Sequence, residues 1–97
     1  MRTPIHPGIV LGEELEERGI SCSALARALE VPPNRITQIV AGEREVTADT
    51  ALRLARYFET SPEFWMNLQK TYELDLARRL HGKEIARIKP HDALACT

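Results

Sequence analysis

The sequence has few cysteines, few aromatic residues and no long apolar run. Of its 97 residues only two are cysteine, and 5% are aromatic. Cys22 and Cys96 are too few and too far apart to form a disulfide scaffold, which favours a cytoplasmic protein. No 18 consecutive residues are apolar, so no segment is predicted to span a membrane. The first ten residues also lack the apolar stretch and cleavage pattern of a secretory signal.

An excess of charge of one sign is also missing. The 13 Lys and Arg residues and 14 Asp and Glu residues give a formal net charge of −1, which argues against a uniformly basic nucleic-acid binder but not against a local basic face. Residues 1–20 carry a net charge of −2, whereas residues 21–42 carry +1. This division suits a protein with two binding surfaces, and the small positive sum predicts weak non-specific DNA binding.

Groups that act in catalysis or metal binding are scattered. The three histidines lie towards the two ends of the chain, and neither the histidines nor the cysteines form the close pairs typical of zinc ligands. No spacing supports a nucleophile with its base. We therefore expect no enzymatic activity, no metal and no cofactor. We interpret His6, near the start of the chain, as a capping or packing residue.

Helical patterning dominates what is present. At 43% hydrophobic residues, a chain of this length is predicted to form one all-α domain. The first helix should begin near Pro7 and end at Gly19. One of its faces carries four acidic residues, Glu13, Glu14, Glu16 and Glu17. This acidic face is either simply solvated or a docking surface for a basic partner.

Two short helices follow. Ser21 is predicted to cap the second helix, and Pro32 and Pro33 suit the first turn of the third. The third helix should reach about Ala41, with Gly42 ending it in a left-handed conformation. Two helices joined by such a tight turn have the arrangement of a helix-turn-helix.

Thr47 is predicted to cap the fourth helix, whose buried stripe is expected to be Leu52, Leu54, Ala55 and Phe58. Ser61 is predicted to cap the fifth helix and Pro62 to occupy its first position, and this helix is predicted to stop at Gly82. The domain is therefore expected to span residues 1–82, with a tail over residues 83–97. Within that tail, residues 84–88 fit either a short strand or a mobile arm.

The fifth helix has more apolar surface than a small monomer buries, which predicts a homodimer. Its apolar positions are the candidate dimer interface: Phe64, Trp65, Leu68, Tyr72 and Leu76. The adjacent aromatic pair in this set also suggests a base-stacking platform, but its helical spacing favours packing in the core.

In a helix-turn-helix the second helix enters the major groove of DNA, so its outward residues should be able to reach base edges. Here they are Asn34, Arg35, Thr37 and Gln38, which have groups that recognise adenine, guanine and the thymine methyl. Backbone phosphates are expected to contact a second set: Ser21, Ser23, Arg27 and Arg44. The alternative to DNA binding is an ordinary pair of helices with a solvated polar face.

Four blocks in order strengthen this interpretation: HPGIVLGEELEERGIS, NRITQIVAGER, TADTALRLARYF and TSPEFWMNLQ. Together they cover most of the chain, which resembles the Xre-type, lambda-repressor-like helix-turn-helix family and, within it, the HigA (VapI-like) antitoxins. The resemblance implies a dimeric antitoxin that neutralises a HigB-type, ribosome-dependent mRNA endonuclease and represses its own operon by binding an operator. Cys22 and Pro33 depart from the family, which often has glutamine and a base-reading side chain at these positions.

Three other functions remain open. The chain is alternatively a protein-interaction module, or a stand-alone helix-turn-helix transcriptional regulator without a toxin partner. A metabolite-responsive repressor is a further possibility, although 97 residues leave no room for a separate ligand domain.

Overall fold

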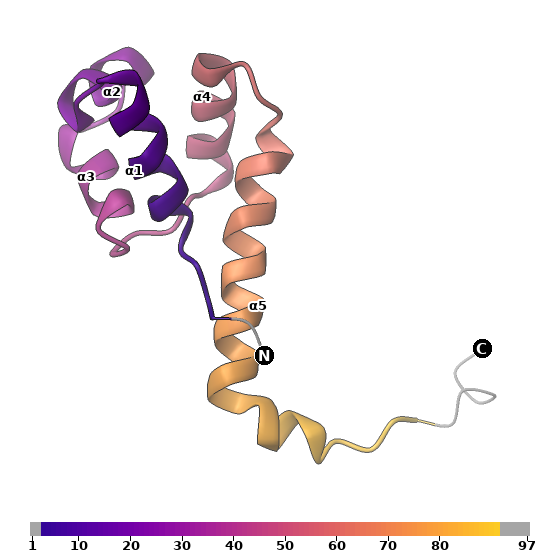
Figure 1. The fold of residues 1–97 in the computed structure, drawn as a ribbon. Helices are drawn as coiled ribbons and strands as arrows, with labels where there is room; N and C mark the ends of the chain where they lie inside the picture. Colours follow the sequence, from indigo (N-terminus) through magenta and orange to yellow (C-terminus); the bar gives the residue numbers. More distant parts are fainter. Residues whose placement is uncertain (1–2, 92–97) are drawn as a thin grey trace.

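The computed structural model describes residues 3–91, and five α-helices fill most of that range (Figure 1). They are α1 (Pro7–Arg18), α2 (Cys22–Leu29), α3 (Pro33–Val40), α4 (Ala48–Phe58) and α5 (Pro62–Ala86). The described residues contain no strand, so the predicted all-α fold is confirmed. Within residues 3–91, none of the helices is both long and apolar enough to cross a bilayer. Cys96 lies outside the described residues.

The helices begin where local capping chemistry places them. His6 precedes α1, and its Nδ1 accepts a hydrogen bond from a backbone N–H two residues later, at 2.9 Å. Ser21, Thr47 and Ser61 precede α2, α4 and α5, and each accepts a hydrogen bond from the N–H three residues later. Each of these contacts satisfies an N–H that the first helical turn leaves without a partner. The predicted roles of these four residues are confirmed.

The connection between α2 and α3 is short because the chain reverses direction at a single left-handed residue. Glu30 ends α2 with a φ of 59°, and the extended Pro32 leads directly into α3. At the other end of α3, Gly42 has a φ of 78°, as predicted. Gly19 likewise ends α1 with a φ of 65°. These turns hold α2 and α3 against each other as a compact pair.

The core lies where α1–α4 meet the first half of α5. Its fully buried large side chains include Leu11, Leu25, Ile36, Leu54 and Trp65. α1 crosses α3 at Gly8, where an added Cβ would collide with the backbone carbonyl of Ile39. The first turn of α1 and the last turn of α3 are therefore in direct backbone contact, which fixes the position of α3 in the domain.

The buried stripe of α4 differs from the predicted one at one position. Leu52 is 60% exposed, whereas the preceding Ala51 is fully buried. Ala51, Leu54, Ala55 and Phe58 follow one another at spacings of three, one and three residues and so share one face of the helix. Leu52 lies one residue away from Ala51 and therefore about 100° around the helix, facing solvent.

α5 is longer than predicted and extends well beyond the other helices (Figure 1). It continues through Gly82 to Ala86, so the predicted stop at Gly82 is wrong. A glycine inside a helix costs only about 1 kcal/mol, and the helix-forming residues that follow make continuation favourable. The first part of the predicted 83–97 tail is thus helical, which rules out a strand over residues 84–88; residues 92–97 lie outside the described residues.

Candidate nucleic-acid interface

α3 turns its polar side chains outward and its apolar side chains into the core. Asn34 and Thr37 are exposed, whereas Ile36 and Ile39 are fully buried. The helix is eight residues long and begins directly after the tight turn that follows α2. This is the placement that a recognition helix requires, because only its outer face can enter a DNA groove.

Arg35 forms an ion pair with a carboxylate on α4. Its Nη1 lies 3.4 Å from Oδ2 of Asp49. The same oxygen accepts a hydrogen bond from Nε of Arg53 at 3.0 Å, and Nη1 of Arg53 donates to the carbonyl oxygen of Leu29 at 2.7 Å. One network therefore joins the end of α2, the start of α4 and the predicted guanine-reading residue. We expect it to limit the directions in which Arg35 points.

Gln38 is held in a similar way from the loop after α3. Nε of Arg44 donates to Oε1 of Gln38 at 2.8 Å. The amide nitrogen then remains available as a donor, and the oxygen keeps a second lone pair with which to accept. Gln38 thus retains both groups that a bidentate contact with adenine requires.

Thr37 is arranged to offer its methyl rather than its hydroxyl. Its Oγ1 donates to the carbonyl oxygen of Pro33, at 3.0 Å, within the same helix. With the donor hydrogen already used, an apolar contact such as one with a thymine methyl suits this residue better than a hydrogen bond to a base.

The predicted phosphate contacts lie on α2 and in the loop after α3. Ser21 accepts from the N–H of Ala24 at 3.1 Å, which leaves its own hydroxyl hydrogen for an outside acceptor. Ser23 and Arg27 are exposed on α2. Cys22 is half-buried and packs against the core, so the exposed polar side chains at the start of α2 are Ser21 and Ser23.

A buried hydrogen bond supports the loop behind α3. The backbone N–H of Val46 donates to Oε1 of Gln69 on α5, at 2.8 Å. Gln69 is only 3% exposed, and its amide nitrogen donates to Oε2 of Glu73 at 2.9 Å. Hydrogen bonds from Gln69 and then from Lys70 lower the pKa of the Glu73 carboxyl. Sequence reasoning missed this contact because no local pattern relates residues 23 positions apart.

The predicted residues on α5 do not all lie on its surface. Trp65 is 1% exposed, packs in the core and donates from Nε1 to Oγ1 of Thr60 at 3.0 Å. Core packing is thus confirmed for Trp65. Trp65 is therefore not accessible for a dimer interface. Phe64 is 44% exposed, so the prediction of core packing is wrong for this half of the aromatic pair. Leu68, Tyr72 and Leu76 are half-buried.

Comparison with known proteins agrees with this geometry. A helix-turn-helix family model matches residues 11–65, which include α2, α3 and α4. The structure of an addiction module antidote protein of the HigA family from Coxiella burnetii is similar throughout, with 49% identity and a TM-score of 0.88. The similarity covers 94% of this chain and 100% of the Coxiella chain. This chain belongs to the HigA family. The resemblance inferred from the sequence is therefore confirmed.

Two further proteins are similar to this HigA-family chain over most of its length. Pseudomonas aeruginosa antitoxin HigA, whose structure includes the higBA promoter, is 50% identical with a TM-score of 0.87, over 91% of this chain and 98% of that chain. Virulence-associated protein I of Dichelobacter nodosus is 51% identical over 76 residues, which are 77% of this chain and 70% of the relative. The α2–α3 pair of this HigA-family chain is therefore a helix-turn-helix.

Proposed function

We propose that the chain is an antitoxin that represses its own operon by placing α3 in the major groove of an operator and that binds and neutralises a HigB-type mRNA endonuclease. The outward polar face of α3 carries the DNA-binding part of this proposal. The Pseudomonas relative, bound to the higBA promoter, supports the same use of the fold.

In the proposed complex, Asn34, Arg35, Thr37 and Gln38 contact bases. Ser21, Ser23, Arg27 and Arg44 contact phosphates, where each cation displaces counterions from the DNA. Glu43 and Glu45 flank Arg44 and reduce the local positive charge. Affinity should therefore depend on direct base contacts more than on bulk charge.

Fluorescence anisotropy with a duplex from the chain's own upstream region tests the DNA-binding part. Binding should be tighter than to a scrambled duplex of the same length and should weaken steeply as salt rises. Arg35→Ala should cost about 1–3 kcal/mol of specific binding. Arg56→Ala is the matched control, because it removes the same charge from an exposed position on α4. Equal affinities for the two variants would remove Arg35 from the base-reading set.

Neutralisation is tested by the protein encoded beside this chain. We expect a short basic protein that co-purifies with the chain and whose ribosome-dependent cleavage of mRNA stops when the chain is added. If the neighbouring protein neither binds nor is inhibited, the chain is a stand-alone helix-turn-helix transcriptional regulator.

The proposed functional form is a homodimer, because a two-fold operator matches two copies of a recognition helix. The apolar side chains of α5 that remain accessible favour this assembly: Phe64, Leu68, Tyr72 and Leu76. Light scattering at micromolar concentration should give twice the chain's 11.0 kDa. A monomeric mass would refute the dimer.

A further inference from the structure

The ring of His6 lies where three parts of the domain meet. The segment before α1 runs alongside α5 (Figure 1), and the His6 ring packs edge-to-face against Tyr72 of α5, with 4.9 Å between the ring centroids. Its Nδ1 accepts the hydrogen bond from the N–H of Gly8 at the start of α1, at 2.9 Å. A Cβ added to Gly42, which follows α3, would lie 3.9 Å from Cγ of His6. One imidazole therefore contacts α1, α5 and the loop after α3.

The two nitrogens of this ring have different partners. Because Nδ1 is the acceptor for the N–H of Gly8, the neutral His6 ring carries its hydrogen on Nε2. The ring also forms a hydrogen bond with the backbone of Arg44, where a ring N–H is the donor and the carbonyl oxygen the acceptor. Protonation places a second hydrogen on Nδ1, where it faces the N–H of Gly8. Only the neutral ring can therefore bridge the start of α1 and the loop.

Both ends of this bridge lead to the recognition helix. In the loop, Nε of Arg44 donates to Oε1 of Gln38 at 2.8 Å. The N–H of Glu43 donates to the carbonyl oxygen of Gln38, also at 2.8 Å. On α1, Gly8 is in backbone contact with Ile39, the neighbour of Gln38. The imidazole is thus connected to one predicted base-reading residue from two sides.

We propose that His6 is a positioning residue for base recognition, whose neutral ring holds the Arg44 loop and the start of α1 so that Gln38 presents its amide to DNA. Protonation of the ring in acid releases this arrangement. The inference rests on the proposed operator binding and adds to it a residue that acts through its neighbours. Operator affinity is therefore sensitive to pH.

The surroundings of His6 favour the neutral ring. A hollow of about 270 Å³ beside it is lined by charged groups of the loop and of α5, and by one phenol: Glu43, Arg44, Glu45, Glu73 and Tyr72. The first turn of α1, the last turn of α3 and residues 3–5 carry no charged side chain. Burial lowers the pKa of His6 below its usual 6.5, against the opposing hydrogen bond to the backbone of Arg44. The ring is therefore neutral above pH 6.5 and becomes charged only in acid.

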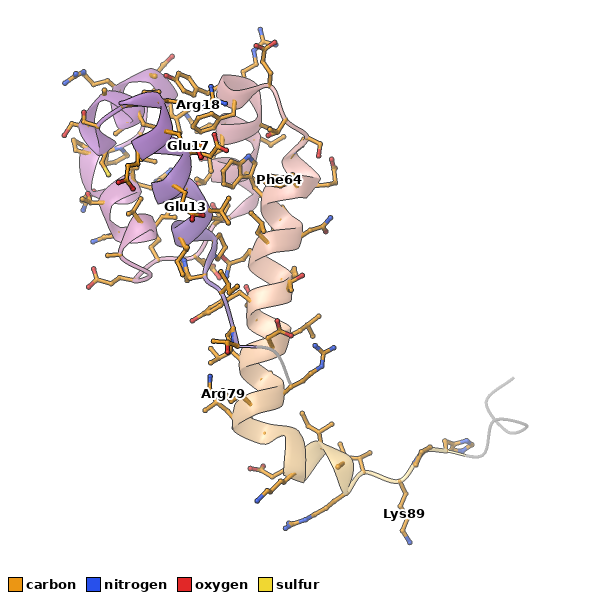
Figure 2. The ribbon with its side chains drawn as sticks, viewed as in Figure 1. Glu13, Glu17, Arg18, Phe64, Arg79 and Lys89 are labelled. Atoms are coloured by element: carbon orange, nitrogen blue, oxygen red, sulfur yellow. The ribbon has the colours of Figure 1, made fainter. Side chains whose placement is uncertain are left out.

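Operator affinity measured against pH by fluorescence anisotropy at constant salt tests this role. Between about pH 7.5 and about pH 5.5 the dissociation constant should rise about threefold to tenfold, as expected for the loss of one hydrogen bond. His6→Asn keeps an acceptor for the cap but lacks the ring, so it should bind with the weaker affinity throughout this range. His81→Asn is the matched control and should titrate as the unaltered chain does. His81 is exposed and lies two residues after Arg79, which Figure 2 shows on the part of α5 that extends beyond the other helices.

A double variant tests whether His6 acts through Gln38. Gln38→Ala removes the amide, so adding His6→Asn to it should weaken operator binding little further, whereas independent contacts would give additive losses. In the DNA-free chain, the amide resonances of Gly8 and Glu43 should shift together with the titration of the His6 ring in NMR spectra. Circular dichroism verifies that each variant is folded at each pH.

Several results would overturn the proposal. They are an operator affinity that does not change with pH, additive losses in the double variant, and His6→Asn binding as tightly as the unaltered chain at neutral pH. An affinity that rises in acid would instead make His6 an additional cation for phosphates. A chain that never prefers the operator to a scrambled duplex would refute the proposed function itself. The NMR titration then decides the role of His6 alone, because loop resonances that do not follow the ring would refute its link to the loop.

Discussion

Gly8 offers the sharpest test of how the domain positions α3. An alanine Cβ at this position collides with the backbone carbonyl of Ile39, and it also lies at 3.0 Å from Cα of Val40. Because these atoms are backbone, no side-chain rotation relieves the collision, and α1 must move away from α3. Overpacking of this kind typically costs 1–3 kcal/mol, and the upper end, about 3 kcal/mol, applies where only backbone can yield.

Gly12 provides a matched control one turn later on α1. A Cβ there meets only Cγ1 of Val40, at 3.4 Å, so the side chain has room. Gly12→Ala should gain up to about 1 kcal/mol, because alanine is the better helix former. In a domain of this size 1 kcal/mol shifts the melting temperature by about 4–8 °C, so Gly8→Ala should melt roughly 12–24 °C lower than the unaltered chain.

Thermal unfolding followed by circular dichroism measures both variants, and operator binding is measured below the melting temperature of each. Gly8→Ala should also weaken specific DNA binding, because its strain displaces α3, whereas Gly12→Ala should bind as the unaltered chain does. Equal melting temperatures for the two variants would refute the inference that backbone contact between α1 and α3 positions the recognition helix.

Three further variants test the contacts around the interface. Gln69→Leu keeps the side-chain volume but removes the acceptor of the buried Val46 N–H, so urea unfolding should show a loss of about 1–3 kcal/mol. Asp49→Asn releases Arg35, so the ratio of operator to scrambled-duplex affinity should fall in anisotropy titrations; an unchanged ratio would contradict this role. Burial lowers the pKa of His6 below its usual 6.5, against an opposing backbone hydrogen bond, so the unfolded chain binds the proton more tightly. Stability should therefore be full above pH 6.5 and fall as the pH drops through the folded-state pKa; His6→Asn, which keeps a cap, should flatten this dependence.

The helix starts could be predicted because their causes are local. Ser21, Thr47 and Ser61 each bind an N–H only three residues away, and such contacts are encoded within one turn of sequence. The outward face of α3 could also be predicted, because helical spacing alone separates Arg35 from the buried Ile36. Both kinds of signal need no knowledge of the tertiary fold.

The predictions from the sequence are wrong or incomplete where a contact between distant residues, or a weak local signal, determines the structure. Gly82 does not end α5, because a single glycine is a weaker signal than the helix formers around it. Leu52 is exposed because the packing of α4 selects one of two neighbouring apolar positions. Asp49 and Gln69 were missed as supports of the interface, since their partners lie 14 and 23 residues away.

These distant contacts make α3 and α5 parts of one rigid unit. Backbone contact at Gly8 fixes the last turn of α3 against α1, and the hydrogen bond from Val46 to Gln69 ties the following loop to α5. If α5 carries the dimer contact, the distance between the two copies of α3 is set by packing rather than by a flexible linker. Major-groove half-sites lie about 34 Å apart, so a dimer that binds an operator must present its recognition helices at that spacing or a multiple of it. With little net positive charge near α3, we expect operator selectivity to depend on that geometry and on the proposed base contacts more than on bulk charge.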